Sequence, residues 1–93
     1  MREMVRFYRS VEVKLLNTIS MPGGTYQKVL SDNIKALYWS RNVSGGDYEV
    51  LIPDANFKAG MYDHLTAYDP STRKVTITDA WGITGTMYEF GIE

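Results

Sequence analysis

Few residues in this chain have the types and spacing that acid–base, metal or nucleophilic chemistry needs. His64 is the one histidine and the chain has no cysteine, so a Cys–His pair and a thiolate metal site are both excluded. A lone histidine without a Ser or Cys nucleophile motif is more often a surface or strand-edge residue than a base or a ligand. We therefore assign no catalytic or metal-binding role to His64.

Carboxylates and glycines are the next candidates for chemistry. The aspartates of the C-terminal half could converge on a cation: Asp54, Asp63, Asp69 and Asp79. Their spacing lacks the closely packed Asp and Asn ligands of a calcium loop, and Asp69 stands at the first position of a predicted turn. The eight glycines are scattered, with no GxxxxGK[ST] or GxGxxG phosphate cradle. We expect a non-enzymatic protein with no metal and no other cofactor.

Aromatic side chains are the remaining candidates for function, since seven Tyr, three Phe and two Trp make up 13% of the chain. Tyr38 and Trp39 are neighbours on a predicted strand, so one should face the core and the other the surface. Exposed Tyr and Trp suit protein contacts because they bury large areas at low entropic cost. We predict these protein-contact residues: Arg6, Tyr8, Arg9, Tyr38, Trp39 and Arg41.

Charges of opposite sign are segregated along the chain, although the net charge is only −1. Residues 1–42 contain seven Lys or Arg and three Asp or Glu, whereas residues 43–93 contain three and eight. The two sets could interleave within one domain, or the basic face of one copy could meet the acidic face of the next. Free nucleic acid is a less favoured partner, because a binder normally has a basic excess over the whole domain.

Length and hydropathy bound the class of protein. A chain of 93 residues, 44% of them hydrophobic, can bury one modest core, so we expect a single β-rich domain over residues 1–93. No apolar stretch approaches the roughly 20 residues of a membrane-spanning helix. The N-terminal residues 1–4 lack the apolar run of a signal peptide. We expect a protein that neither spans a membrane nor is secreted through a signal peptide.

The N-terminal half predicts three strands. Residues 5–15 alternate apolar and polar side chains, which indicates a strand within a long N-terminal strand or arm over residues 1–16. After a Pro-Gly-Gly break, residues 26–30 and 34–40 predict two strands joined as a hairpin by Ser-Asp-Asn. The apolar spacing over residues 25–40 also permits a short helix.

The C-terminal half predicts further strands and one clear hairpin. Residues 48–52 form a strand with apolar side chains on both faces, and residues 56–62 a connecting arm. An Asp69-Pro70 turn joins strands at 65–68 and 73–78, and residues 86–92 form the last strand. The sequence therefore predicts an all-β fold, a small sandwich or barrel of six to seven short, mainly antiparallel strands.

Residues 58–90, about a third of the chain, resemble small β modules of bacteriophage virion proteins. The resemblance rests on a Gly-led strand at Gly60, a strand at 65–68 and a turn at 69–73, a Thr/Val strand at 75–78 followed by Trp81, and Gly-Thr-Met-Tyr-Glu-Phe at 85–90. It implies a non-enzymatic role in a virion, as a capsid-decoration, head–tail or tail component present in many copies. It carries over no catalytic residues.

We therefore expect a structural, protein-binding module that self-associates or docks on a larger lattice, located in a virion or in the host cytoplasm. Its expected partners are protein subunits, and the N-terminal arm could add a strand to a neighbour's sheet. Two alternatives stay open. One is a small phage-encoded inhibitor of a host protein. The other is an OB-like barrel binding single-stranded nucleic acid, in which cations flank stacking aromatics: Arg6, Arg9, Lys35 and Arg41.

Overall fold

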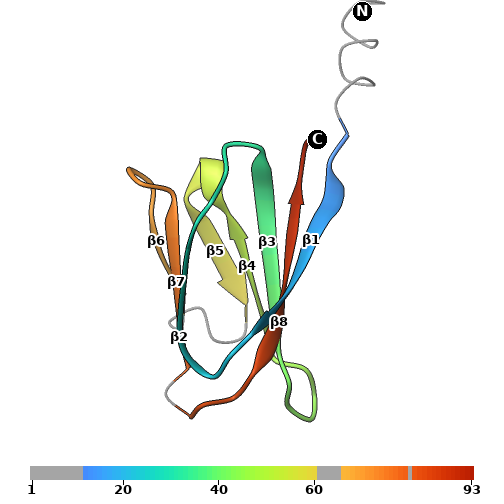
Figure 1. The fold of residues 1–93 in the computed structure, drawn as a ribbon, viewed down its shortest axis with the longest axis vertical. Helices are drawn as coiled ribbons and strands as arrows, with labels where there is room; N and C mark the ends of the chain where they lie inside the picture. The colour runs from blue at the N-terminus through green and yellow to red at the C-terminus, as the bar shows by residue number, and fades with distance from the viewer. Residues whose placement is uncertain (1–11, 61–65, 80) are drawn as a thin grey trace, which may run out of the picture.

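A computed structural model describes residues 12–60, 66–79 and 81–93 of the chain (Figure 1). Within these ranges the chain forms eight strands and one short 3-10 helix, η1 (Pro53–Ala55). The strands are β1 (Lys14–Met21), β2 (Gly24–Val29), β3 (Ile34–Arg41), β4 (Tyr48–Ile52), β5 (Phe57–Gly60), β6 (Thr66–Asp69), β7 (Lys74–Asp79) and β8 (Gly85–Gly91). The predicted all-β class is confirmed, with eight strands instead of six to seven. No helix in these ranges has the length and apolar character needed to cross a membrane.

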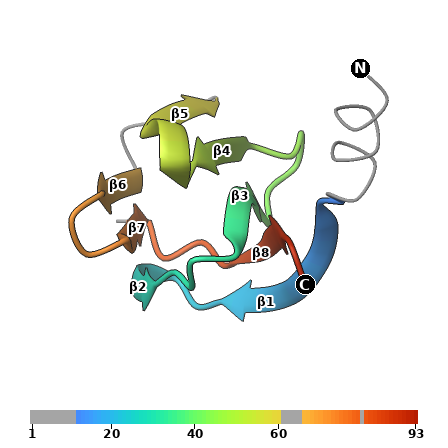
Figure 2. The same cartoon turned by 90° about the horizontal axis from the view of Figure 1, so that it is seen from above.

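The strands form two antiparallel sheets. The larger sheet has the order β1-β8-β3-β4-β5, and the smaller has the order β2-β7-β6. Seen from above, the smaller sheet lies on one side of the larger one, as in a sandwich (Figure 2). The core between them is built from the following buried side chains: Met21, Leu30, Ile34, Leu37, Trp39, Leu51, Val75, Ile77 and Met87.

A bent ribbon of paired strands connects the sheets. β1 pairs with β8 in the larger sheet, and their chain neighbours β2 and β7 pair with each other in the smaller sheet. At the bend, a Cβ atom on Gly23 would lie 2.1 Å from the carbonyl oxygen of Gly82. Only glycine permits this approach of the two backbones. The bend thus depends on a residue with no side chain.

The hairpin predicted around Asp69 is confirmed. β6 and β7 pair in antiparallel register from Thr66–Ile77 to Asp69–Lys74. The Oδ1 atom of Asp69 accepts hydrogen bonds from the Ser71 hydroxyl at 2.7 Å and from the Ser71 backbone N–H at 3.0 Å. These two bonds hold the pKa of Asp69 below its ordinary value of 3.8. Local turn chemistry fixes this part of the fold.

Two other sequence predictions are corrected, and a third is described only in part. Residues 26–30 and 34–40 fall in strands, not in a helix, but β2 and β3 pair in different sheets and form no hairpin. The predicted connecting arm at 56–62 contains β5, which pairs with β4. Most of the strand predicted at 5–15 lies outside the described residues, and β1 itself continues to Met21, beyond the predicted arm. Long-range pairing, which local patterns do not encode, decides the first two.

Candidate protein-contact face

The side of the larger sheet that faces away from the smaller sheet is the most distinctive surface of the described chain. Successive side chains on a strand point to opposite faces, so the pairing register assigns each residue to the inner or the outer face. We call the outer face the contact face. It comprises Leu15, Thr18, Ser20, Ala36, Tyr38, Ser40, Tyr48, Val50, Ile52, Phe57, Ala59, Thr86, Tyr88 and Phe90. None of these side chains is charged at neutral pH.

The pairing register arranges the contact face in three rows that cross the strands. The first row is apolar: Leu15, Phe90 and Ala36 pair across β1, β8 and β3, and Ile52 and Phe57 pair across β4 and β5, one residue beyond the paired part of β3 and β4. The second row runs Thr18, Tyr88, Tyr38, Val50, Ala59, and the third runs Ser20, Thr86, Ser40, Tyr48. Leu15 and Phe57, at the two ends of the first row, are 52% and 53% exposed. Large apolar side chains therefore stand in solvent at both edges of the sheet, and Phe90, Ala36 and Ile52 between them are half-buried.

Tyrosine rings pack against one another at the centre of the contact face. The ring centroid of Tyr38 lies 5.7 Å from that of Tyr48, stacked at 23°, and 5.9 Å from that of Tyr88, tilted at 38°. Offset and tilted ring pairs at such distances are favourable and restrict side-chain motion. The three rings form a rigid platform across β4, β3 and β8.

The outer face of the smaller sheet differs in composition. The residues that alternate outward there are mostly hydroxyl, amide or charged: Thr25, Gln27, Val29, Ala67, Asp69, Lys74, Thr76 and Thr78. This is the usual solvent face of an antiparallel sheet. An exposed apolar patch of several strands' width typically marks an interaction site. Within the described chain, the contact face is therefore the candidate site for binding.

The predicted contact residues separate into three groups. Arg6, Tyr8 and Arg9 lie outside the described residues. Tyr38 lies at the centre of the contact face, whereas Trp39 is 4% exposed in the core. The Nε1–H of Trp39 donates a hydrogen bond to Oγ1 of Thr66 at 3.0 Å, which links the two sheets. The expectation that one member of the Tyr38–Trp39 pair is buried and the other faces the surface is confirmed.

Arg41 is also in the interior, where it holds one end of the sandwich together. Its guanidinium is 6% exposed and donates to Oδ2 of Asp79 at 2.7 Å and to Oδ2 of Asp47 at 2.9 Å. The ring of Trp81, itself 67% exposed, lies 5.3 Å from the Arg41 Cζ atom. The structure thus gives Arg41 a role in packing, and its buried guanidinium is not on the surface.

Cations of the N-terminal half pair with carboxylates of the C-terminal half. Besides Arg41 and its two aspartates, Lys28 Nζ lies 2.7 Å from Oε2 of Glu89, an ion pair without the directional geometry of a hydrogen bond. Glu89 is buried and also accepts a hydrogen bond from Asn17 Nδ2 at 2.8 Å. Among the described residues, the segregated charges of the sequence therefore interleave within one chain, as the first of the two interpretations expects.

Asp54 joins two cations at the opposite end of the sandwich. Its carboxylate accepts from Lys35 Nζ at 3.0 Å and from Arg73 Nη1 at 3.0 Å. Arg73 also donates to the carbonyl oxygens of Ser31 and Ile34, both at 2.9 Å. The hydrogen bonds from Lys35 and then Arg73 hold the pKa of Asp54 below its ordinary value of 3.8. Both Lys35 and Arg73 are therefore paired with Asp54.

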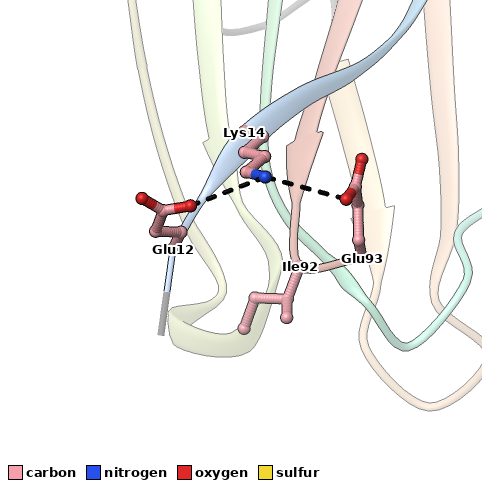
Figure 3. A pocket seen from close by; sticks show the side chains of 4 residues that line it. All are labelled: Glu12, Lys14, Ile92 and Glu93. Atoms are coloured by element: carbon pink, nitrogen blue, oxygen red, sulfur yellow. Dashed lines mark ion pairs between the residues drawn. The ribbon is translucent and has the colours of Figure 1, made fainter. Parts of the chain in front are cut away.

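Other possible sites are weaker. A shallow hollow of about 180 Å³ is lined by Glu12, Lys14, Ile92 and Glu93 (Figure 3). Lys14 pairs there with Glu12 at 3.5 Å and Glu93 at 3.7 Å, and exposed pairs of this kind contribute little. Asp54, Asp69 and Asp79 have separate partners, and Asp63 lies outside the described residues. Among the described side chains, no group of three or more His, Asp or Glu could hold a metal ion.

Most of the contact face was not predicted from the sequence. Tyr48, Tyr88, Phe90 and Phe57 were assigned to strands or to a connecting arm without a functional role. The sequence contains one signal for this face, the alternation of Thr86, Tyr88 and Phe90 with Met87 and Glu89. The alternation places the charge of Glu89 on one face of the strand and the aromatic rings on the other. Only the pairing of β8 with β3 shows that the aromatics are outside.

Comparison of the chain with protein-family profiles, curated proteins and solved structures gives no match. The fold and the contact face are therefore the basis for any statement of function.

Proposed function

We propose that this protein is a non-enzymatic protein-binding module that docks on other protein subunits through the contact face. The observation that carries the proposal is the uncharged, aromatic outer face of the larger sheet, with its stacked Tyr38, Tyr48 and Tyr88 rings. Aromatic side chains held rigid by their neighbours bury area at low entropic cost, and Tyr is enriched among residues that dominate binding energy. Each hydroxyl can pair with a polar group of the partner.

The proposed setting is a phage virion, in which the module decorates a capsid or joins head or tail components. The resemblance of residues 58–90 to small virion modules supports this setting. A compact sandwich with one docking face also suits a part that is used in many copies on a lattice. The same face could equally serve a phage-encoded inhibitor that binds a host protein, and the identity of the bound protein distinguishes the two.

The geometry favours protein over single-stranded nucleic acid as the partner. A nucleic-acid platform needs cations beside its stacking rings to neutralise phosphates. Of the four cations predicted to flank the rings, Arg41 is buried with Asp79 and Lys35 is bonded to Asp54, while Arg6 and Arg9 lie outside the described residues. The contact face itself contains no Lys or Arg.

The proposal is tested by retention of a partner on the immobilised chain. Tyr38→Glu places a charge at the centre of the contact face, and Thr76→Glu places the same charge on the outer face of the smaller sheet. We expect a protein from lysate or disrupted particles that is retained by the wild type and by Thr76→Glu, and at least about 10-fold less by Tyr38→Glu.

Circular dichroism of both variants confirms that the fold is intact before the comparison is made. Equal retention of every bound protein by the two variants contradicts the proposal. Binding of an oligonucleotide at low salt, with loss at high salt, would favour the nucleic-acid alternative instead.

A further inference from the structure

We infer that a second copy of this chain adds to the β1 edge of the larger sheet, with the β1 strands of the two copies paired antiparallel about a two-fold axis at Ile19. The inference goes beyond the proposed function, because it uses the edge of the sheet and not the contact face. Three observations support it: the edge is open, it lacks the features that protect the other sheet edges, and its side chains match a second copy in one register.

The β1 strand is the open border of the larger sheet (Figure 1). Within the described chain it pairs with β8 alone. Backbone N–H and C=O groups of a strand point to both of its sides, so part of the groups of β1 point away from β8. Such a row of donors and acceptors is a template for a further strand. Thr18 and Ser20 are exposed and Ile19 is half-buried, so a strand can approach this edge.

The other three sheet edges carry features that discourage pairing with another chain. β5 and β6 are four residues long, and they contain the charged residues Lys58 and Asp69. β2 contains Lys28, whose charge points inward to the other sheet. Short edges and inward charges are devices that protect a sheet from edge-to-edge association. β1 has eight residues, and beyond its bulge residues 17–21 contain no charge and no proline. This edge is therefore the least protected of the four.

The side chains of residues 17–21 fix the register. When two β1 strands run antiparallel about Ile19, Thr18 of one copy lies opposite Ser20 of the other. Ile19 then meets Ile19 of the second copy on the core side. The register keeps inner side chains beside inner ones and outer beside outer, whereas a shift of one residue would pair the core face with the contact face. Hydroxyl pairs and pairs of β-branched side chains across strands are favourable.

Charge and size are consistent with this pairing. Lys14 is the one charged residue of β1, and it lies at the start of the strand. Antiparallel pairing about Ile19 keeps the two Lys14 side chains roughly 30 Å apart, well beyond the screening length of about 10 Å at 0.1 M salt. A joint of one short strand pair buries less than the usual interface of about 1,600 Å², so we expect a reversible dimer. The contact faces of the two copies then adjoin and stay open to a partner.

Two double variants of the same exposed positions test the register. Thr18→Lys with Ser20→Lys places like charges opposite each other, and Thr18→Lys with Ser20→Glu places opposite charges there. We expect the Lys/Lys variant to associate at least about 10-fold more weakly than the wild type, and the Lys/Glu variant to stay within about three-fold of it. Mixing the Lys/Lys variant with Thr18→Glu/Ser20→Glu should restore association. Circular dichroism confirms that each variant is folded.

Sedimentation equilibrium measures the association of each protein. For the wild type we expect a mass that rises with concentration from 10.6 kDa toward twice that value. A constant mass of one chain up to millimolar concentration overturns the inference, whereas retention of a different protein on the contact face would still support the proposed function. Equal association of the Lys/Lys and Lys/Glu variants overturns the inferred register. A dimer that is lost in Ala36→Lys and kept in the Lys/Lys variant overturns the inferred edge.

Discussion

The two outer faces of the sandwich obey the same backbone geometry and differ in chemistry. The smaller sheet presents threonines, a glutamine, charged side chains and one exposed valine to solvent, and the larger sheet presents tyrosine, phenylalanine and aliphatic side chains with four serines and threonines. The chain thus builds an ordinary solvent face on one sheet and departs from it on the other. Because apolar surface in water is unfavourable, a partner that covers the larger sheet gives a physical reason for the departure.

The larger sheet also places its charged side chains on its inner face. Arg41 and Glu89 are buried, and each meets groups of opposite charge or hydrogen-bonding groups from another strand. Burial of a charge is costly unless it is paired, so these contacts bear on stability. The buried charge pairs and the proposed contact surface therefore lie on opposite faces of one sheet, and substitutions can address each face separately.

Arg41→Ala, on the inner face, should lower the free energy of unfolding more than the other substitutions. It should have no specific effect on binding at the contact face. Removal of the guanidinium leaves Asp79 buried without its cation, which typically costs about 3–5 kcal/mol of the free energy of unfolding. Unfolding in guanidinium chloride, monitored by tryptophan fluorescence, measures the loss of unfolding free energy. Lys74→Ala, an exposed position on β7, is the control and should change stability by less than about 0.5 kcal/mol.

Trp39→Phe should weaken the fold by an intermediate amount. The variant loses the buried hydrogen bond from Nε1 to Thr66 and part of the core volume, and we expect a cost of about 1–3 kcal/mol. The midpoint of urea unfolding checks this value. We expect association of the variant to equal that of the wild type. Unchanged stability would show that the hydrogen bond to Thr66 between the two sheets is not needed.

Tyr38→Thr, one residue away on the outer face, should affect partner binding, which Trp39→Phe should leave unchanged. The substitution removes two ring contacts from the outer face, each worth about 0.5–1.5 kcal/mol, and threonine keeps a side chain suited to strands. We expect a loss of stability in the same range as for Trp39→Phe, together with a loss of partner binding of about 10-fold or more that Trp39→Phe does not show. Isothermal titration or sedimentation measures the second quantity. A larger effect on binding from Trp39→Phe would reverse the assignment of the two faces.

Asp54→Asn should have the smallest effect, and the effect should depend on pH. Because the folded pKa of Asp54 is lowered, its contribution to stability is present above the unfolded value of 3.8 and is lost as the pH falls through the folded pKa. The difference in unfolding free energy between wild type and variant should therefore shrink below about pH 4. Asp69, which titrates in the same range, is present in both proteins. A difference that persists at pH 2 would contradict the role of the carboxylate charge.

The parts of the fold that could be predicted depend on local chemistry. Asp69-Pro70 specifies its turn through side-chain bonds to residues two positions away, so the β6–β7 hairpin is visible in the sequence. β5 was missed because Lys58, Ala59 and Gly60 have low strand propensity, and pairing with β4 overrides that preference. The separation of β2 and β3 into different sheets depends on partners more than 40 residues away.

The candidate site was predictable only in part for the same reason. Alternation shows that Tyr38 and Trp39 face opposite sides, but it does not say which side is the core. The charge of Arg41 predicts a surface position. Its burial becomes possible only because Asp79, 38 residues later in the chain, lies beside it. The tyrosine platform brings together β3, β4 and β8, whose register is a property of the folded sheet.

We propose that the contact face, and not the outer face of the smaller sheet, binds protein. The most direct measurement compares Ala36→Lys with Ala67→Lys, since both replace a strand alanine by the same cation on opposite outer faces. We expect association with the partner protein, measured by its retention, to fall at least about 10-fold for Ala36→Lys and to stay at the wild-type level for Ala67→Lys. Equal association of the two folded variants would contradict the claim.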